Sequence, residues 1–229
     1  MRDVFVLLML LAVLSFIFFL VFLKESYLFD ASIHLAIFSL AMWLIWKKDL
    51  KTTLDSIGFP GGILKTIIFT IIGLGAIFFV LFILGVIAFY LGFNDQEKIT
   101  EKLADLPLYI LFFAVAFAPI SEELLFRAFL VSACEGFFLR HMPLGNRKTD
   151  RPPSRGIIFM AALFGIIVSS VIFGILHLGY GSVVEVVGTI VVGMILAAVF
   201  RLSKSVTPCI LAHMIYNLLS IAALKLLAG

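Results

Sequence analysis

The sequence predicts an all-α protein, a polytopic bundle of membrane-spanning helices. Hydrophobic residues make up 63% of the chain, and the mean hydropathy is +1.21. A soluble domain is roughly 45–50% apolar, so this composition excludes an ordinary soluble protein. The apolar residues also run in continuous segments of spanning length without strict alternation, which indicates helices.

We expect seven transmembrane helices enclosing a catalytic cavity, at about 4–23, 28–46, 64–92, 107–139, 156–178, 183–200 and 206–228. The first segment is longer than a secretory signal core, which favours a membrane helix over a cleaved signal. The fourth is long enough to be one tilted helix or two helices broken near Pro119. In the second case Ser121 could cap the helix that restarts, and the count would be eight.

Basic residues are concentrated in alternate loops. Loops 47–56, 140–155 and 201–205 carry Lys and Arg, whereas 93–106 is mainly acidic and 178–182 is uncharged. Cytoplasmic loops are enriched in Lys and Arg, so we expect the N-terminus and the basic loops in the cytoplasm. The protein would be multi-pass in the plasma membrane of a prokaryote or the endoplasmic reticulum of a eukaryote.

The loops are too short for a soluble domain, so any function must lie within the bundle or at its mouth. We divide the chain into residues 1–106, with three helices and a short polar or interfacial segment near 94–106, and a catalytic core at 107–229. The two cysteines, Cys134 and Cys209, follow no metal-binding or redox pattern.

Three short polar patterns interrupt the apolar core: Glu122-Glu123-x-x-x-Arg127, Phe173-x-x-x-His177 and His213-x-x-x-Asn217. An ionisable side chain in lipid costs roughly 2.5–3.5 kcal/mol, so residues of this kind usually serve a function. Other polar residues, including Glu135 and Glu185, are expected to be solvated at the membrane surface.

Glu122 and Glu123 point about 100° apart on a helix and need not share a role. Glu123 and Arg127 are four residues apart, lie on one face and can neutralise each other. Glu122 is then the acid available to act as a general base. The alternative is that both glutamates are structural.

His213 and Asn217 also share a helix face. A histidine can act as base, electrophile or metal ligand, and an asparagine can donate to a developing oxyanion. Phe173, one turn before His177, is expected to pack against that imidazole. The set Glu122, His177 and His213 could instead form a three-ligand zinc site with an open position.

The depths of the two histidines conflict if the helices are straight and parallel. His177 would lie near the outer end of its helix and His213 about 10 Å from the cytoplasmic end. A shared site therefore requires a strongly tilted helix or one that ends inside the bilayer. Gly179-Tyr180-Gly181 would supply such a break.

The three patterns, in this order on successive helices, resemble those of the CAAX-protease and bacteriocin-processing family of intramembrane endopeptidases. This family includes the type II CAAX prenyl endopeptidases of the Ras-converting type and the bacterial Abi proteins. The resemblance covers about residues 107–220. It implies a helical bundle around a cone-shaped cavity, and hydrolysis of prenylated CAAX-type or other membrane-associated peptides near their C-terminus.

The resemblance also implies roles for individual residues. Glu122 would activate the attacking water, which His177 and His213 would position or polarise. His213 or Asn217 would stabilise the tetrahedral oxyanion. The remaining motif residues would support the site, with Arg127 able to hold a carboxylate.

The resemblance leaves the metal open, because the mechanism has been described both with and without one. The chain has no H-x-x-x-H or H-E-x-x-H pair, so we expect that no cofactor is required, with zinc as the alternative. The expected partners are membrane lipid and the peptide substrate, and no nucleic acid. The sequence does not predict the oligomeric state.

Two other classes of function remain open. An immunity or binding protein could keep the fold without turnover, although no motif residue is missing. A proton-coupled transporter could use buried Glu and His as a relay, but such proteins usually contain internal repeats, and we see none.

Overall fold

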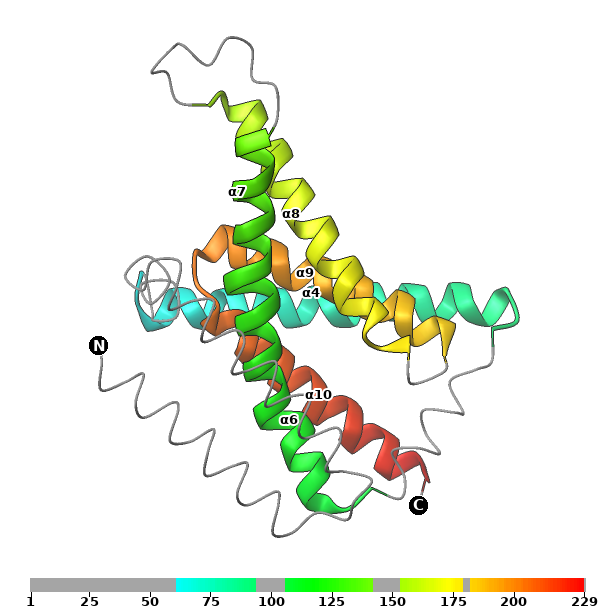
Figure 1. The fold of residues 1–229 in the computed structure, drawn as a ribbon. Coiled ribbons are helices and arrows are strands. Elements are labelled where there is room, and N and C mark those ends of the chain that lie inside the picture. The colour runs from blue at the N-terminus through cyan, green and yellow to red at the C-terminus, as the bar shows by residue number, and fades with distance from the viewer. Residues whose placement is uncertain (1–60, 94–105, 142–152, 179–181, 229) are drawn as a thin grey trace, which may run out of the picture.

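The computed structural model describes residues 61–93, 106–141, 153–178 and 182–228, and its regular structure there is helical. The elements shown in Figure 1 are α4 (Gly62–Tyr90), α6 (Leu108–Glu123), the π-helix η1 (Leu124–Val131), α7 (Ser132–His141), α8 (Arg155–Ile175), α9 (Val183–Ser203) and α10 (Thr207–Ala228).

Within the described residues, five helices are long and apolar enough to cross a membrane. They coincide with five of the seven predicted segments, so the chain is an integral membrane protein with a helical core. The predicted segments 4–23 and 28–46 lie outside the described residues. The same is true of loop 47–56, of the polar segment 94–105 and of residues 142–152 in the large basic loop.

The fourth predicted segment is one uninterrupted span. Helices α6, η1 and α7 follow each other without a break from Leu108 to His141. Pro119 lies inside α6 and does not end it, so this segment is the single helix of the two possibilities considered and not a pair broken near Pro119. Ser121 is not a cap, because its Oγ donates to the Ala118 carbonyl at 2.8 Å within the same helix. Hydroxyl side chains of this kind help membrane helices tolerate proline.

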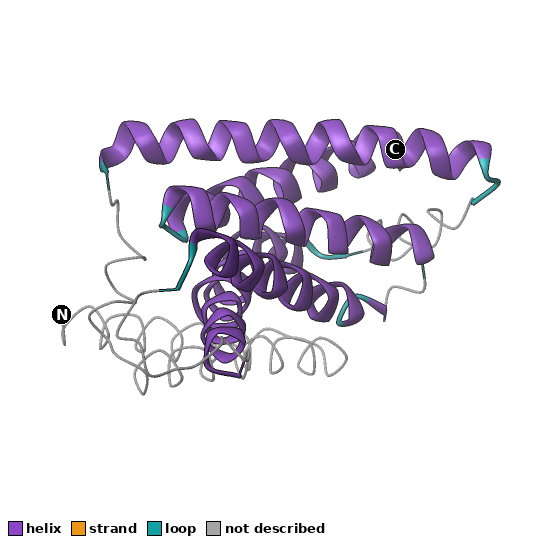
Figure 2. Ribbon diagram, turned by 90° about the horizontal axis from the view of Figure 1, so that it is seen from above, coloured by secondary structure: helices purple, strands orange, loops and turns teal. Residues whose placement is uncertain are grey.

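Helix α9 lies at the centre of the described core, in contact with α4, α8, α10 and η1. The buried apolar cluster is drawn from four elements: Ile77 of α4; Leu124, Ala128 and Val131 of η1; Val192, Leu196, Ala197, Val199 and Phe200 of α9; and Val206, Cys209 and Ala212 at the start of α10. The helices cross at steep angles instead of running parallel (Figure 1). Seen from above, α4 runs across the view, whereas α6 and α7 are seen nearly end-on (Figure 2).

Small residues allow α8 and α9 to approach closely. A Cβ at Gly193 would lie 3.0 Å from the Ser170 Cβ, and one at Gly174 would collide with Ile190. In lipid there is no hydrophobic driving force for helices to associate, so they associate through close van der Waals packing. Small side chains allow that close approach. The contact fixes α8, which carries the F-x-x-x-H pattern, against the central helix.

A tight turn joins α9 to α10. Lys204 adopts a left-handed backbone conformation, with φ of 60°. The Ser203 hydroxyl accepts from the Ser205 amide at 3.1 Å and donates to the Ser205 carbonyl at 2.9 Å. The Ser205 hydroxyl in turn accepts from the Thr207 amide at 3.2 Å, at the first residue of α10. This turn sets the register in which α10 presents His213.

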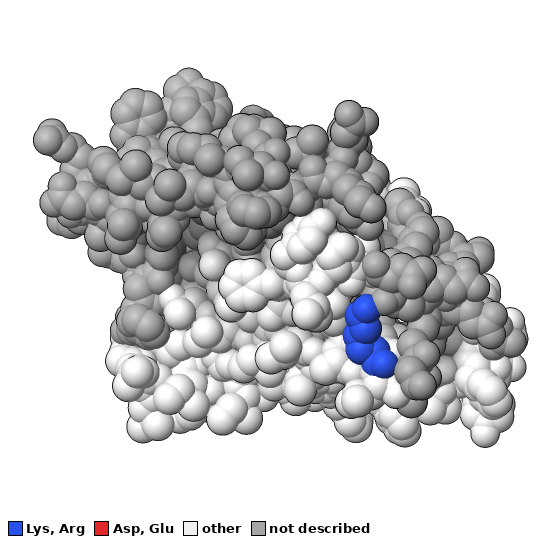
Figure 3. Space-filling model, turned by 90° about the horizontal axis from the view of Figure 1, so that it is seen from below, with Lys and Arg blue, Asp and Glu red and all other residues white. Residues whose placement is uncertain are grey.

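Large apolar side chains are exposed along α4, where Phe82 and Phe89 are 71% and 73% accessible. On the face seen from below, the described surface is uncharged apart from a basic side chain (Figure 3). An apolar surface of this kind suits contact with lipid hydrocarbon.

Candidate active site

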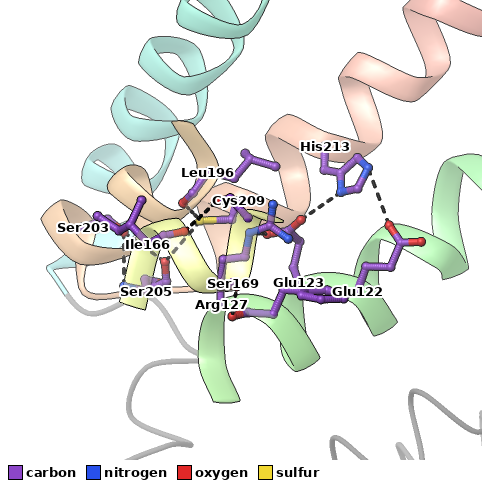
Figure 4. Close-up of polar contacts among 12 residues, drawn as sticks. Glu122, Glu123, Arg127, Ile166, Ser169, Leu196, Ser203, Ser205, Cys209 and His213 are labelled. Carbon is purple, nitrogen blue, oxygen red and sulfur yellow. Dashed lines mark hydrogen bonds and ion pairs between the residues drawn. The ribbon is translucent and has the colours of Figure 1, made fainter. Parts of the chain in front are cut away.

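The imidazole of His213 lies between two carboxylates of α6. Its Nδ1 is 2.9 Å from Glu123 Oε1, and its Nε2 is 3.8 Å from Glu122 Oε2. Because an ionised carboxylate only accepts hydrogen bonds, the Nδ1 proton is donated to Glu123. Figure 4 shows the ring of His213 facing both glutamates across the gap between α10 and α6.

Glu123 is also bonded to Arg127, as the spacing of four residues predicts. Arg127 Nε lies 3.0 Å from Glu123 Oε2, and the two side chains are 1% and 0% exposed. Glu123 thus accepts a hydrogen bond from the imidazole on one oxygen, and its other oxygen forms an ion pair with Arg127 that lacks hydrogen-bond alignment. The charge of Arg127 compensates the buried carboxylate for its loss of hydration.

Phe173 lies at the centre of the site, and the expectation that it packs against His177 is confirmed. The two ring centroids are 4.8 Å apart. The same phenyl ring is 6.1 Å from the His213 ring at 90°, and the Arg127 Cζ lies 4.5 Å from its centroid. The last distance is that of a cation–π contact. Phe173 thus touches residues from all three polar patterns.

His177 follows the end of α8, in a turn. Its Nδ1 lies 2.8 Å from the Phe173 carbonyl, so Nδ1 carries the proton that this carbonyl accepts. Both His177 and His213 contact the Phe173 ring. Straight, parallel helices would have placed the two histidines at different depths in the membrane. The conflict disappears because α8 ends at Ile175 and the helices cross steeply. Residues 179–181, where we predicted a break, lie outside the described residues.

Asn217 ties α10 to α6. Its Nδ2 donates to the Ala114 carbonyl at 2.9 Å. The bond places Asn217 on the side of α10 that faces the helix carrying Glu122, which agrees with the predicted shared face of His213 and Asn217. One hydrogen of the amide group is engaged by this bond.

Two buried residues beside the site were missed by the sequence analysis. Ser169 Oγ donates to the Phe126 carbonyl at 2.9 Å, and Cys209 Sγ donates to the Leu196 carbonyl at 3.2 Å. Ser169 precedes Phe173 by four residues, and Cys209 precedes His213 by four. This spacing was the available signal, but both residues are common in apolar helices.

Glu135 is not solvated as expected, because it pairs with Arg201 at 2.9 Å and is only 15% exposed. The pair joins α7 to α9. Glu185 is half-buried in the first turn of α9, and its Oε1 accepts from the Thr189 hydroxyl at 3.5 Å. Both carboxylates therefore belong to structural contacts between or within helices.

The donor set does not fit a bound metal. Among the described residues, no group of three or more His, Cys, Asp or Glu side chains converges closely enough to hold an ion. The described residues include Glu122, His177 and His213, the set considered from the sequence as zinc ligands.

A comparison with protein families agrees with the motif order. The model of the family described as Type II CAAX prenyl endopeptidase Rce1-like matches residues 104–219, just over half of the chain and all three polar patterns. No curated protein and no solved structure matches the chain significantly. The members of such a family are proteases of membrane-associated peptides. The chain belongs to the Rce1-like family of type II CAAX prenyl endopeptidases.

Proposed function

We propose that the protein is an intramembrane endopeptidase that hydrolyses a peptide bond near the C-terminus of prenylated CAAX-type peptides. Water is the nucleophile, Glu122 is the general base, and no covalent intermediate forms. One observation carries this proposal: the imidazole of His213 lies between Glu122 and Glu123, and Glu123 is itself paired with Arg127.

The two glutamates have different tasks. Glu123 holds the Nδ1 proton of His213 and so fixes the orientation of the ring, as the carboxylate of a catalytic triad does. Glu122 Oε2 and His213 Nε2, at 3.8 Å, are too far apart for a direct hydrogen bond. A water molecule with hydrogen bonds of about 2.8 Å to both atoms fits beside this gap. Glu122 and His213 Nε2 together can therefore hold the attacking water.

The reaction follows from this placement. As the water oxygen attacks the scissile carbonyl carbon, Glu122 takes the departing proton. The resulting tetrahedral intermediate carries its negative charge on the former carbonyl oxygen. When the carbon–nitrogen bond breaks, Glu122 returns the proton to the amine. The first products are a carboxylic acid and an amine, and Glu122 is again ionised. The acid then gives its proton to the amine, which leaves a carboxylate and an ammonium group.

His177 and Asn217 complete the site. With its Nδ1 proton on the Phe173 carbonyl, neutral His177 presents Nε2 as an acceptor. When His213 Nε2 is protonated and donates to the water, the two hydrogens of the water can be directed to Glu122 and His177. The amide of Asn217, fixed by the Ala114 carbonyl, is placed to donate its second hydrogen to the oxyanion. His213 adds a donor when its Nε2 is protonated.

We further propose that no metal takes part, because the potential ligands do not converge. The choice of substrate rests on family membership together with the lipid-facing apolar surface, from which a prenyl chain can enter laterally. We place the basic loops in the cytoplasm, the compartment in which prenylated proteins are made accessible to such an enzyme.

The purified protein in detergent tests the proposal with one CAAX peptide, prepared with and without a prenyl group on its cysteine. Mass spectrometry identifies the bond that is cut. We expect release of the C-terminal tripeptide from the prenylated form and none with Glu122→Gln. Glu185→Gln, which changes a carboxylate that accepts from Thr189 within its own helix, is the control and should retain activity. A folded wild type that cuts neither peptide would refute the substrate class.

A further inference from the structure

One face of α8 extends the F-x-x-x-H pattern by two turns. Gly165, Ser169, Phe173 and His177 follow each other at intervals of four residues. Such a spacing places side chains in a row along one side of a helix. Phe173 and His177 belong to the site already described. Gly165 and Ser169 contact the π-helix η1 instead.

The π-helix is an unusual element at a sensitive place. It begins directly after Glu123 and contains Arg127, so its geometry determines how these two residues line up. A π-helix bonds each amide to the carbonyl five residues earlier, is rare, and is found mostly as short insertions at functional sites. Surrounding contacts must therefore hold it against relaxation to an α-helix.

Ser169 supplies such a contact. Its Oγ donates to the Phe126 carbonyl at 2.9 Å, joining α8 to the backbone of η1. The serine is 1% exposed and the phenylalanine 2%, so water cannot replace the bond. Within the site, Figure 4 shows Ser169 beside the segment that carries Arg127.

Gly165 makes the approach possible one turn earlier. A Cβ at this position would lie 2.8 Å from the Val131 carbonyl and 3.0 Å from Glu135 Cγ. A larger residue would push α8 away from the end of η1. The short distance at Gly165 thus keeps the Ser169 hydroxyl within reach of its acceptor.

We propose that Ser169 is a positioning residue, whose hydroxyl holds η1 in the π-helical register that sets Glu123 and Arg127 against Phe173 and His213. Phe126 and Arg127, on either side of the bonded carbonyl, both pack on Phe173, at 4.9 Å and 4.5 Å. Loss of the bond allows η1 to shift, and the displacement passes through Arg127 to Glu123 and the imidazole.

Ser170 provides a matched control. It is also 1% exposed, and its hydroxyl makes a bond of similar length, 2.7 Å. The acceptor, however, is the Ile166 carbonyl of its own helix, and the side chain faces Gly193 of α9. Ser170→Ala therefore removes the same atoms from the same helix without touching η1.

The test compares Ser169→Ala with Ser170→Ala by hydrogen–deuterium exchange of peptides covering residues 124–131 in detergent, and by kinetics. We expect Ser169→Ala to speed exchange there by about threefold or more. We also expect kcat to fall roughly 10- to 100-fold, with KM changed less than about twofold, as for a small displacement of catalytic groups. Ser169→Cys, a weaker donor, should be intermediate. Ser170→Ala should leave exchange and kcat near the wild type.

The kinetic arm rests on the proposed function, but the exchange arm does not. An inactive wild type would refute the protease, while the exchange comparison would still decide the role of Ser169. Unchanged exchange in Ser169→Ala, or equal effects of both serine variants, would overturn the proposal.

Discussion

His213 and Glu123 are 90 positions apart in the sequence, and their side chains meet at 2.9 Å between Nδ1 and Oε1. The bond joins α10 to α6, and both side chains are buried in the helical core. Arg127 pairs with the other oxygen of Glu123. We therefore assign Glu123 the role of orienting the His213 imidazole. The division of roles between the adjacent glutamates follows from that geometry.

Replacing Glu123 by Gln tests the orienting role. The amide keeps the shape of the side chain but removes the negative charge that receives the His213 proton. We expect kcat to fall roughly 10²- to 10⁴-fold, in line with loss of the carboxylate that orients a catalytic imidazole. We also expect a loss of about 3–5 kcal/mol in the free energy of unfolding, because Arg127 is left as an uncompensated buried charge. Steady-state kinetics and thermal unfolding in detergent measure the two effects.

The double variant Glu123→Gln/Arg127→Met separates these effects. Removing both charges together should recover much of the lost stability, since an apolar residue replaces the unpaired guanidinium. Activity should stay low, because His213 still lacks its carboxylate. Recovery of activity together with stability would contradict the orienting role of Glu123.

Arg127→Lys tests whether the guanidinium itself matters. A lysine keeps the charge, but it has no planar group that can pair with Glu123 and stack on Phe173 at the same time. We expect a loss of about 1.5–3 kcal/mol in unfolding free energy. Arg201→Lys is the control, since Arg201 also contacts one carboxylate at 2.9 Å but is 37% exposed, and should cost only about 0–1 kcal/mol. Equal losses for both variants would argue against a special role of the buried guanidinium.

Asn217→Ala removes the proposed oxyanion donor and the tether to Ala114. We expect kcat to fall roughly 10²- to 10³-fold while KM changes little, as when one oxyanion donor is lost. Leu218→Ala, at a neighbouring position that is 52% exposed, should leave kcat within about twofold of wild type. An Asn217→Ala enzyme with most of its kcat would reduce Asn217 to a helix tether.

Treatment with a zinc chelator, followed by gel filtration into metal-free buffer, should leave the cleavage rate unchanged. The reason is that the described His, Cys, Asp and Glu side chains include no group of three close enough together to hold an ion directly. Elemental analysis of the active protein measures bound zinc directly. Loss of activity that added zinc restores would show that the metal-free mechanism is wrong.

The sequence was informative wherever a pattern depended on a single helix. The spacing of Glu123 and Arg127 predicted their ion pair, and the F-x-x-x-H spacing predicted the contact between Phe173 and His177. In both cases the partners are four residues apart and lie about one turn apart along a single helical stretch.

Features that depend on how helices are rotated against each other could not be predicted. The sequence did not indicate which of the two glutamates bonds to His213. Adjacent residues of a helix point about 100° apart, so a rotation of α6 about its axis by that angle would exchange Glu122 and Glu123. Pro119 suggested a break, yet the helix continues into η1, where Ser169 from a distant segment supplies a donor. Pairings of this kind arise only from tertiary packing.

The cleavage rate of a fluorogenic prenylated CAAX peptide, compared between wild type and Glu122→Gln, would show whether Glu122 is the general base. Both are purified in detergent and checked for equal thermal unfolding. We predict that the variant keeps its fold and its KM but loses roughly 10²- to 10⁴-fold in kcat, the usual contribution of a general base. A folded Glu122→Gln protein that cleaves the peptide at near the wild-type rate would contradict the account.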